Sequence, residues 1–140
     1  MVDRAKVGKR SNLKGKTFER DIARRLTALT GKTWRRTICS GGQYESDDIK
    51  CLEPGWPSIE CKNRQDITLT KVYRNPAILR GIVSESVILI FNSEGFRICI
   101  VPTSIAPSCN IDAPVANFEL DGVAYWLFSL DYFAEVIHGK

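Results

Sequence analysis

The longest apolar runs of this sequence have the length of a single β-strand. Val87–Phe91 and Phe96–Val101 are apolar and rich in β-branched residues, and only Asn92-Ser93-Glu94-Gly95 separates them. Two such runs, joined by a short polar segment that contains glycine, predict a β-hairpin. No run reaches the roughly 18–20 apolar residues that are needed to span a bilayer. We therefore expect a globular protein that makes no contact with membranes.

A second pattern, near the N-terminus, predicts an amphipathic helix. Apolar residues recur there at intervals of four, four and three, which places them on one helix face: Phe18, Ile22, Leu26 and Leu29. We expect the helix to run from about Gly15 to Leu29 and to end at Gly31. Residues 1–14 lack this periodicity and carry much positive charge. We therefore predict a flexible basic arm over residues 1–14 and a single domain over residues 15–140.

The rest of the chain alternates between extended and helical patterns. Short extended segments bounded by turn residues predict strands: Trp34–Ile38, Asp48–Leu52, Pro57–Lys62 and Val123–Phe128. The second and third of these are close enough to pair as a hairpin. Pro76 begins or bends a helix, Ser129 caps a terminal helix that ends near Ile137, and residues 102–117 are expected to form a surface loop. This order predicts an α/β fold with a central mixed β-sheet flanked by helices.

The five cysteines are odd in number, and no two of them form a C-x-x-C pair. This argues against a zinc site and, in a chain without a secretory signal, against a disulfide framework. We expect reduced and mostly buried thiols in a cytoplasmic protein.

Positive charge is concentrated in the first quarter of the chain. Residues 1–36 carry twelve Lys and Arg against three Asp and Glu, which gives +9, whereas residues 37–140 carry eight against thirteen, which gives −5. Such an asymmetry indicates a polyanionic partner, nucleic acid above all. A solubilising tail and a solvated helix face would explain the same charges equally well.

Asp48, Glu60 and Lys62 form the strongest candidate site. Side chains two residues apart share one face of a strand, so Glu60 and Lys62 lie together and Cys61 faces the other side. If this strand pairs with the preceding one, Asp48 lies beside Glu60. Two carboxylates suit a hard cation such as Mg²⁺, which polarises a phosphodiester, while Lys62 stabilises the transition-state charge. Alone, however, an acid-x-Lys triplet often forms only a surface ion pair.

Four ordered elements resemble the PD-(D/E)XK nuclease superfamily, and within it the archaeal-type Holliday-junction resolvases and their viral relatives. They are the runs Lys14–Arg20 and Arg36–Gly42, the pair Asp48-Ile49, and Glu60-x-Lys62. The resemblance covers residues 14–62. It implies a restriction-endonuclease-like core and a metal-dependent endodeoxyribonuclease of the crossover-junction type.

The resemblance also implies roles for individual residues. By spacing alone, Glu19 is a glutamate favoured by the helix dipole, but the resemblance places it at the metal, or at the metal's water. Ser40 belongs to a glycine loop that forms either a simple turn or a phosphate contact, and the resemblance implies an active-site role. Asp47 stands where the superfamily often has proline, and is expected to tune the field beside Asp48. The implied metal ligands are Glu19, Asp48, Glu60 and the backbone carbonyl of Cys61.

Arginines around this site are candidates for contacts with DNA phosphates: Arg20, Arg24, Arg35, Arg36 and Arg64. The leading hypothesis is a Mg²⁺-dependent endodeoxyribonuclease, with Mn²⁺ as a substitute, that resolves four-way junctions as a homodimer and needs no small-molecule cofactor. A viral member would act in the cytoplasm of its host cell. One alternative is a PD-(D/E)XK nuclease that acts on duplex, flap or end DNA in repair or restriction. The other is a DNA-binding module that has lost catalysis.

Overall fold

The computed structural model describes residues 4–37, 48–105 and 116–138, with side chains described from residue 16 onward. Its elements in chain order are α1 (Arg4–Thr30), β1 (Trp34–Arg36), β2 (Ile49–Cys51), β3 (Ser58–Lys62), α2 (Leu69–Arg74), the 3-10 helix η1 (Pro76–Leu79), β4 (Val87–Ser93), β5 (Phe96–Pro102), β6 (Ala116–Leu120), β7 (Val123–Ser129) and α3 (Leu130–Ile137).

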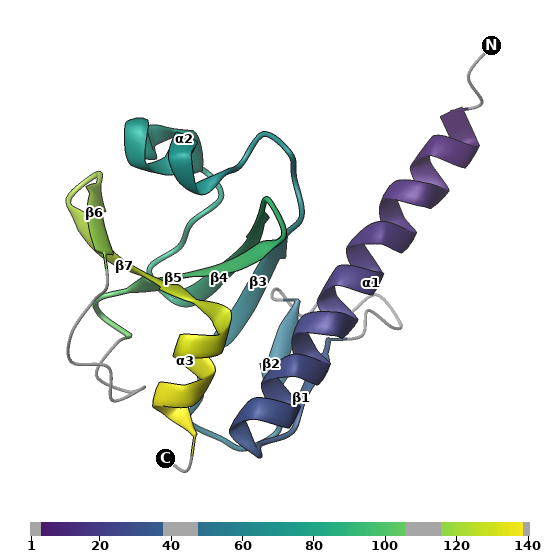
Figure 1. The fold of residues 1–140 in the computed structure, drawn as a ribbon, viewed down its shortest axis with the longest axis horizontal. Helices are drawn as coiled ribbons and strands as arrows, with labels where there is room; N and C mark the ends of the chain where they lie inside the picture. The colour runs from purple at the N-terminus through teal and green to yellow at the C-terminus, as the bar shows by residue number, and fades with distance from the viewer. Residues whose placement is uncertain (1–3, 38–47, 106–115, 139–140) are drawn as a thin grey trace.

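The described strands form one seven-stranded sheet in the order β1-β2-β3-β4-β5-β7-β6 (Figure 1). Neighbouring strands are antiparallel except β3 and β4, which run parallel, so the sheet is mixed. The predicted α/β class with a mixed sheet and flanking helices is therefore confirmed, and it is compatible with a restriction-endonuclease-like core. None of the described helices is long and apolar enough to cross a membrane.

Apolar side chains fill both faces of the sheet, because the central strand β4 is buried on each side. On one face, Ile88 and Ile90 pack with Phe133 of α3 and with the apolar stripe of α1. On the other face, Leu89 and Phe91 pack against residues from α2 and η1. Each such side chain contributes roughly 1.5–3 kcal/mol when it leaves water. Figure 1 shows α1 and α3 together on one side of the sheet and α2 apart from them.

The first helix is longer than the sequence pattern indicated. It begins at Arg4 rather than near Gly15, so the predicted start of this helix is wrong, while the flexibility of residues 1–14 stays a prediction. The prediction relied on an apolar stripe, but Lys, Arg, Ala and Leu favour helix without one. Gly31 ends the helix as predicted, with φ 73° and its N–H bonded to the carbonyl of Thr27 at 3.1 Å.

The second difference is β6, a strand that the sequence pattern did not predict. The predicted loop 102–117 lies outside the described residues over 106–115, and its last two residues belong to β6. This strand pairs with β7 through Asp121 and Gly122, whose φ values of 52° and 81° are those of a type I′ hairpin turn. The turn dipeptide Asp-Gly was the available signal.

Strand directions bring several polar chain segments to one end of the sheet. Because β1 to β3 alternate in direction, the end of β1, the start of β2 and the end of β3 lie together, and Arg36 pairs with Ile49 there. Since β4 is parallel to β3, the turn from β4 to β5 lies at this end as well. The candidate site is built here.

Candidate active site

Asp48 directly precedes β2, and the hairpin with β3 fixes its position. Its Oδ2 accepts a hydrogen bond from the backbone N–H of Cys61 at 2.8 Å, and its own N–H donates to the carbonyl oxygen of Ile59 at 3.0 Å. These two bonds, next to the pairing of Ile49 with Ile59, hold Asp48 beside residues 59–61 of β3. Within the described residues no partner engages Oδ1 of Asp48. One carboxylate oxygen thus orients the group, and the other is available to a ligand.

Glu60 and Lys62 share one face of β3. Lys62 Nζ lies 3.5 Å from Glu60 Oε1, and the two side chains keep 35% and 24% of their surface exposed. Cys61 between them is buried in the core on the opposite face. The ion pair alone is what a simple surface triplet would show. Asp48 beside it turns the triplet into two carboxylates and one cation at a strand end.

Glu19 approaches the same end of the sheet from α1. Its side chain is 19% exposed, and its Oε2 accepts a hydrogen bond from Nε of Arg36 at 2.8 Å. Arg36, a predicted contact for DNA phosphates, therefore neutralises Glu19 in this structure. Its partner gives no sequence signal, because seventeen residues separate the two side chains.

The pKa of the Cys61 thiol is affected by the acidic residues of the candidate site. Burial raises its pKa above the usual range, and the negative charges of Asp48 and Glu19, with smaller effects of Cys99 and Glu60, raise it further. All three carboxylates therefore act on one buried atom.

The donor chemistry of this cluster fits a hard divalent cation. Carboxylate oxygens are its only side-chain donors, and Mg²⁺ is commonly held by one or two carboxylates while it keeps several waters. Asp48 and Glu60 satisfy that requirement without a third group. Among the residues with described positions, no three His, Cys, Asp or Glu groups are arranged to hold a metal ion. In this arrangement Glu19 is held by Arg36, and would have to turn to join them.

Four of the five predicted DNA-contacting arginines lie on one open groove between α1 and β1. The groove has a volume of 580 Å³ and a largely apolar floor. Its basic residues are Arg20, Arg24, Arg35 and Arg36. The fifth arginine, Arg64, lies apart from this groove and binds Asp66 through both its Nε and Nη2. Ser40 and Asp47 fall outside the described residues, so the structure places neither.

Comparison with protein families assigns the chain. Residues 10–79, half of the sequence, match the model of a family described as "Phage putative PDDEXK endonuclease". The chain belongs to this family. The match runs from α1 to η1 and contains Glu19, Asp48, Glu60 and Lys62. No significant match was found among curated proteins or solved structures.

Membership in the family confirms the resemblance to PD-(D/E)XK nucleases. It makes the chain a nuclease that acts on DNA, and nucleases of this type generally depend on a divalent metal ion. The family assignment indicates phosphodiester cleavage, and Asp48, Glu60 and Lys62 are residues of a type suited to that reaction.

Proposed function

We propose that this protein is a Mg²⁺-dependent endodeoxyribonuclease that resolves four-way DNA junctions, with Mn²⁺ as a substitute. The observation that carries the proposal is the arrangement at the end of the β2–β3 hairpin. There the Asp48 carboxylate accepts a hydrogen bond from the backbone N–H of Cys61, which lies between Glu60 and Lys62, and Lys62 Nζ lies 3.5 Å from Glu60 Oε1. The same proposal places the enzyme inside the cell, where its DNA is, and in the host cytoplasm for a phage protein.

Asp48 and Glu60 are the residues that would hold the metal ion, with Glu19 and the carbonyl oxygen of Cys61 as further ligands. When bound, the ion polarises the phosphodiester and lowers the pKa of its water. The N–H of Cys61 keeps the Asp48 carboxylate at a fixed angle, so little reorganisation is needed when substrate arrives. Lys62 would move from Glu60 toward the scissile phosphate, where its ammonium stabilises the transition-state charge. Ser40 would contact the scissile strand or the metal-bound water.

Arginines would hold the DNA across this end of the sheet. In the described part of the chain, Arg20, Arg24 and Arg35 form no ion pair with an acidic residue, and all three line the α1–β1 groove. Guanidinium groups suit phosphate geometry, because they donate several hydrogen bonds in one plane. Arg36 and Arg64 would join them after leaving Glu19 and Asp66.

The junction substrate is supported by the resemblance of residues 14–62 to the resolvases. Two opposed strands must be cut in a four-way junction, so a homodimer follows from the substrate and would place two such sites on one DNA. A nuclease of flaps, ends or plain duplex would use the same chemistry. The difference between these substrates therefore has to be measured.

Cleavage of matched DNAs tests the proposal. A synthetic four-way junction, a flap and a linear duplex of the same sequence are incubated with and without Mg²⁺. We expect cleavage of the junction with Mg²⁺ alone, and a loss of about 10²–10³-fold or more in Asp48→Asn, Glu60→Gln and Lys62→Ala. Glu53→Gln is the matched control, because Glu53 is an exposed acid at the other end of the hairpin.

Two results would contradict the proposal in different ways. Binding of branched DNA without cleavage in Mg²⁺ or Mn²⁺ would leave a DNA-binding module and no enzyme. Equal cleavage of the junction and the linear duplex would keep the nuclease but remove its selectivity for junctions.

A further inference from the structure

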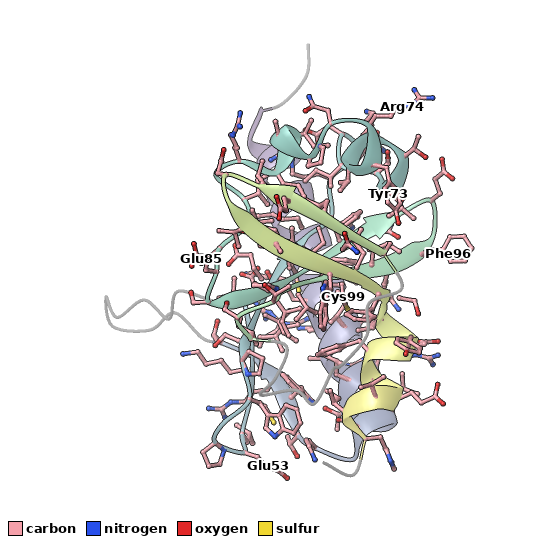
Figure 2. The ribbon with its side chains drawn as sticks, turned by 90° about the vertical axis from the view of Figure 1, so that its left-hand side faces the viewer. Glu53, Tyr73, Arg74, Glu85, Phe96 and Cys99 are labelled. Carbon is pink, nitrogen blue, oxygen red and sulfur yellow. The ribbon has the colours of Figure 1, made fainter. Side chains whose placement is uncertain are left out.

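Phe96 is the most exposed large apolar side chain in the described part of the protein. It keeps 72% of its surface in water, and Figure 2 shows its ring projecting outward from the hairpin of β4 and β5. The turn before it is a tight one, with φ of 51° at Glu94 and 86° at Gly95. These are type I′ values, which give a hairpin a rigid connection. An aromatic ring is therefore held out into solvent on a stiff support.

The register of the sheet places Phe96 at the same end as the candidate active site. Lys62 pairs with Phe91 across the parallel strands, and Ser93 pairs with Phe96 across the hairpin. Paired residues share a face, and side chains two apart on one strand share it too. Lys62, Phe91, Ser93 and Phe96 therefore lie on one face, together with Glu60.

A pocket lined mainly by polar residues lies between the segment that follows β3 and the β4–β5 turn. It has a volume of 350 Å³, and its lining residues are Asn63, Arg64, Gln65, Ile67, Thr68, Asn92, Glu94 and Gly95. Figure 1 shows the segment that leaves β3 running beside the β4–β5 turn. The pocket thus begins one residue after Lys62 and ends one residue before Phe96. Side-chain amides, which both donate and accept hydrogen bonds, come from both of its walls.

A second hollow lies on the other side of Phe96. It is lined by Phe96 itself and by residues of α1, β5 and the start of α3, among them Arg25 and Arg97. Each of these arginines is paired with an aspartate, Arg25 with Asp131 and Arg97 with Asp21. The ring is thus flanked by a pocket with side-chain amides on one side and by two ion-paired arginines on the other. That combination suits a nucleotide better than an apolar protein surface.

We propose that this surface binds an unpaired nucleobase of the branched DNA, with Phe96 as its stacking platform. The proposal rests on the nuclease function and names the part of the substrate that is recognised. A base in a duplex is already stacked and paired, so it gains nothing from Phe96. A single-stranded base beside a flap is free to stack at the least cost, and a base pair at a four-way branch opens more easily than one inside a continuous duplex. Such a base can stack on the ring while the amides of the pocket take its hydrogen-bonding edge. Selectivity for branched DNA follows from this difference.

Binding of matched DNAs to Phe96→Ala tests the proposal. The probes are a flap and a four-way junction that carry 2-aminopurine at the branch, and a linear duplex of the same sequence. Ca²⁺ replaces Mg²⁺, so that binding is measured apart from cleavage. Base–aromatic stacking is worth about 1–3 kcal/mol, so we expect the Kd for branched DNA to rise about 5- to 150-fold while the Kd for duplex stays the same.

Two further variants test whether the aromatic ring itself is responsible for the effect. Phe96→Trp should keep the affinity, because it keeps the ring. Leu52→Ala should change nothing, because Leu52 is an exposed apolar residue at the opposite end of β2. In the wild type and in Phe96→Trp, the 2-aminopurine fluorescence should change on binding, because the base leaves its DNA neighbours for the ring, and in Phe96→Ala it should not.

Three outcomes would overturn the inference. They are an unchanged Kd for branched DNA in Phe96→Ala, an equal loss of affinity for duplex, and a change of oligomeric state in sedimentation that accounts for the loss. The nuclease proposal fails separately, when Mg²⁺ gives no cleavage even though the Phe96-dependent binding is present. Because Phe96 is exposed, its removal should leave the melting temperature unchanged.

Discussion

One backbone N–H of β3 determines how Asp48 is oriented. The bond from Cys61 N to Asp48 Oδ2 joins the carboxylate of Asp48 to the strand that carries Glu60 and Lys62. A hydrogen bond to a charged acceptor stabilises a fold by about 1.5–3 kcal/mol. The same contact therefore serves both the stability of the hairpin and the geometry of the site.

Substitutions of Asp48 should separate these two contributions. Asp48→Asn keeps an oxygen that can accept the bond from Cys61, so we expect a stability within about 1 kcal/mol of the wild type. Asp48→Ala leaves this N–H without its acceptor, and should lose about 1–3 kcal/mol. The free energy of unfolding in urea measures both. If the alanine variant unfolds like the wild type, another group satisfies the N–H and the bond does not hold the site.

Some contacts of the candidate site could be predicted from the sequence, and others could not. That Glu60 and Lys62 share a face follows from strand alternation, and that Asp48 lies beside β3 follows from the hairpin. The ion pair of Glu19 with Arg36 could not be predicted, because it depends on where α1 lies across the sheet. Phe96 looked like an ordinary strand residue in the sequence. Only the tertiary structure leaves it exposed.

At the scale of elements, α3 depends on a cap that the sequence showed. Ser129 Oγ accepts a hydrogen bond from Tyr132 N at 3.1 Å, and Asp131 in the first turn binds Arg25 of α1 at 2.8 Å. The cap starts the helix at the point where β7 ends, so α3 turns back over the core. Phe133 and Ile137 are fully buried in that position.

Removal of the cap should destabilise the protein without affecting its chemistry. Ser129→Ala is expected to cost about 1 kcal/mol, which lowers the Tm by roughly 3–5 °C in a chain of this size. Ser129→Asp keeps a capping oxygen and should stay near the wild-type Tm. Thermal unfolding followed by circular dichroism measures the shift. An unaltered Tm in the alanine variant would show that packing alone determines where α3 begins.

The elements that could be predicted were those marked in the sequence by apolar runs, a turn or a helix cap. The β4–β5 hairpin has two apolar runs and a turn, and α3 has its cap, and both appear as predicted. In β6, residues Ala116–Leu120 are only half buried and hold one Asn and one Glu, so hydrophobicity gave a weak pattern. The N-terminal part of α1 had no apolar stripe to detect. Both elements were missed because the prediction relied on the spacing of apolar residues rather than on the helix or strand propensity of each residue.

At the scale of the whole molecule, arginines divide into two groups. Arg25, Arg36, Arg64, Arg80 and Arg97 each bind an acidic residue. Most of the others with described side chains line the α1–β1 groove. An ion-paired arginine must break a contact before it binds a phosphate, whereas Arg20, Arg24 and Arg35 of the groove need not. The groove should therefore supply most of the electrostatic affinity for DNA.

The salt dependence of binding measures this contribution. Each phosphate contact that is lost should reduce the slope of log K against log salt by about 0.9 for duplex DNA. We expect that reduction in Arg24→Ala and in Arg35→Ala, equally for a linear duplex and a junction, because phosphates are common to both. Arg80→Ala is the control, since Arg80 binds Asp121 at 2.9 Å and lies outside the groove. If all three variants share the wild-type slope, the DNA lies elsewhere. If only the junction is affected, these arginines recognise branch geometry rather than backbone charge.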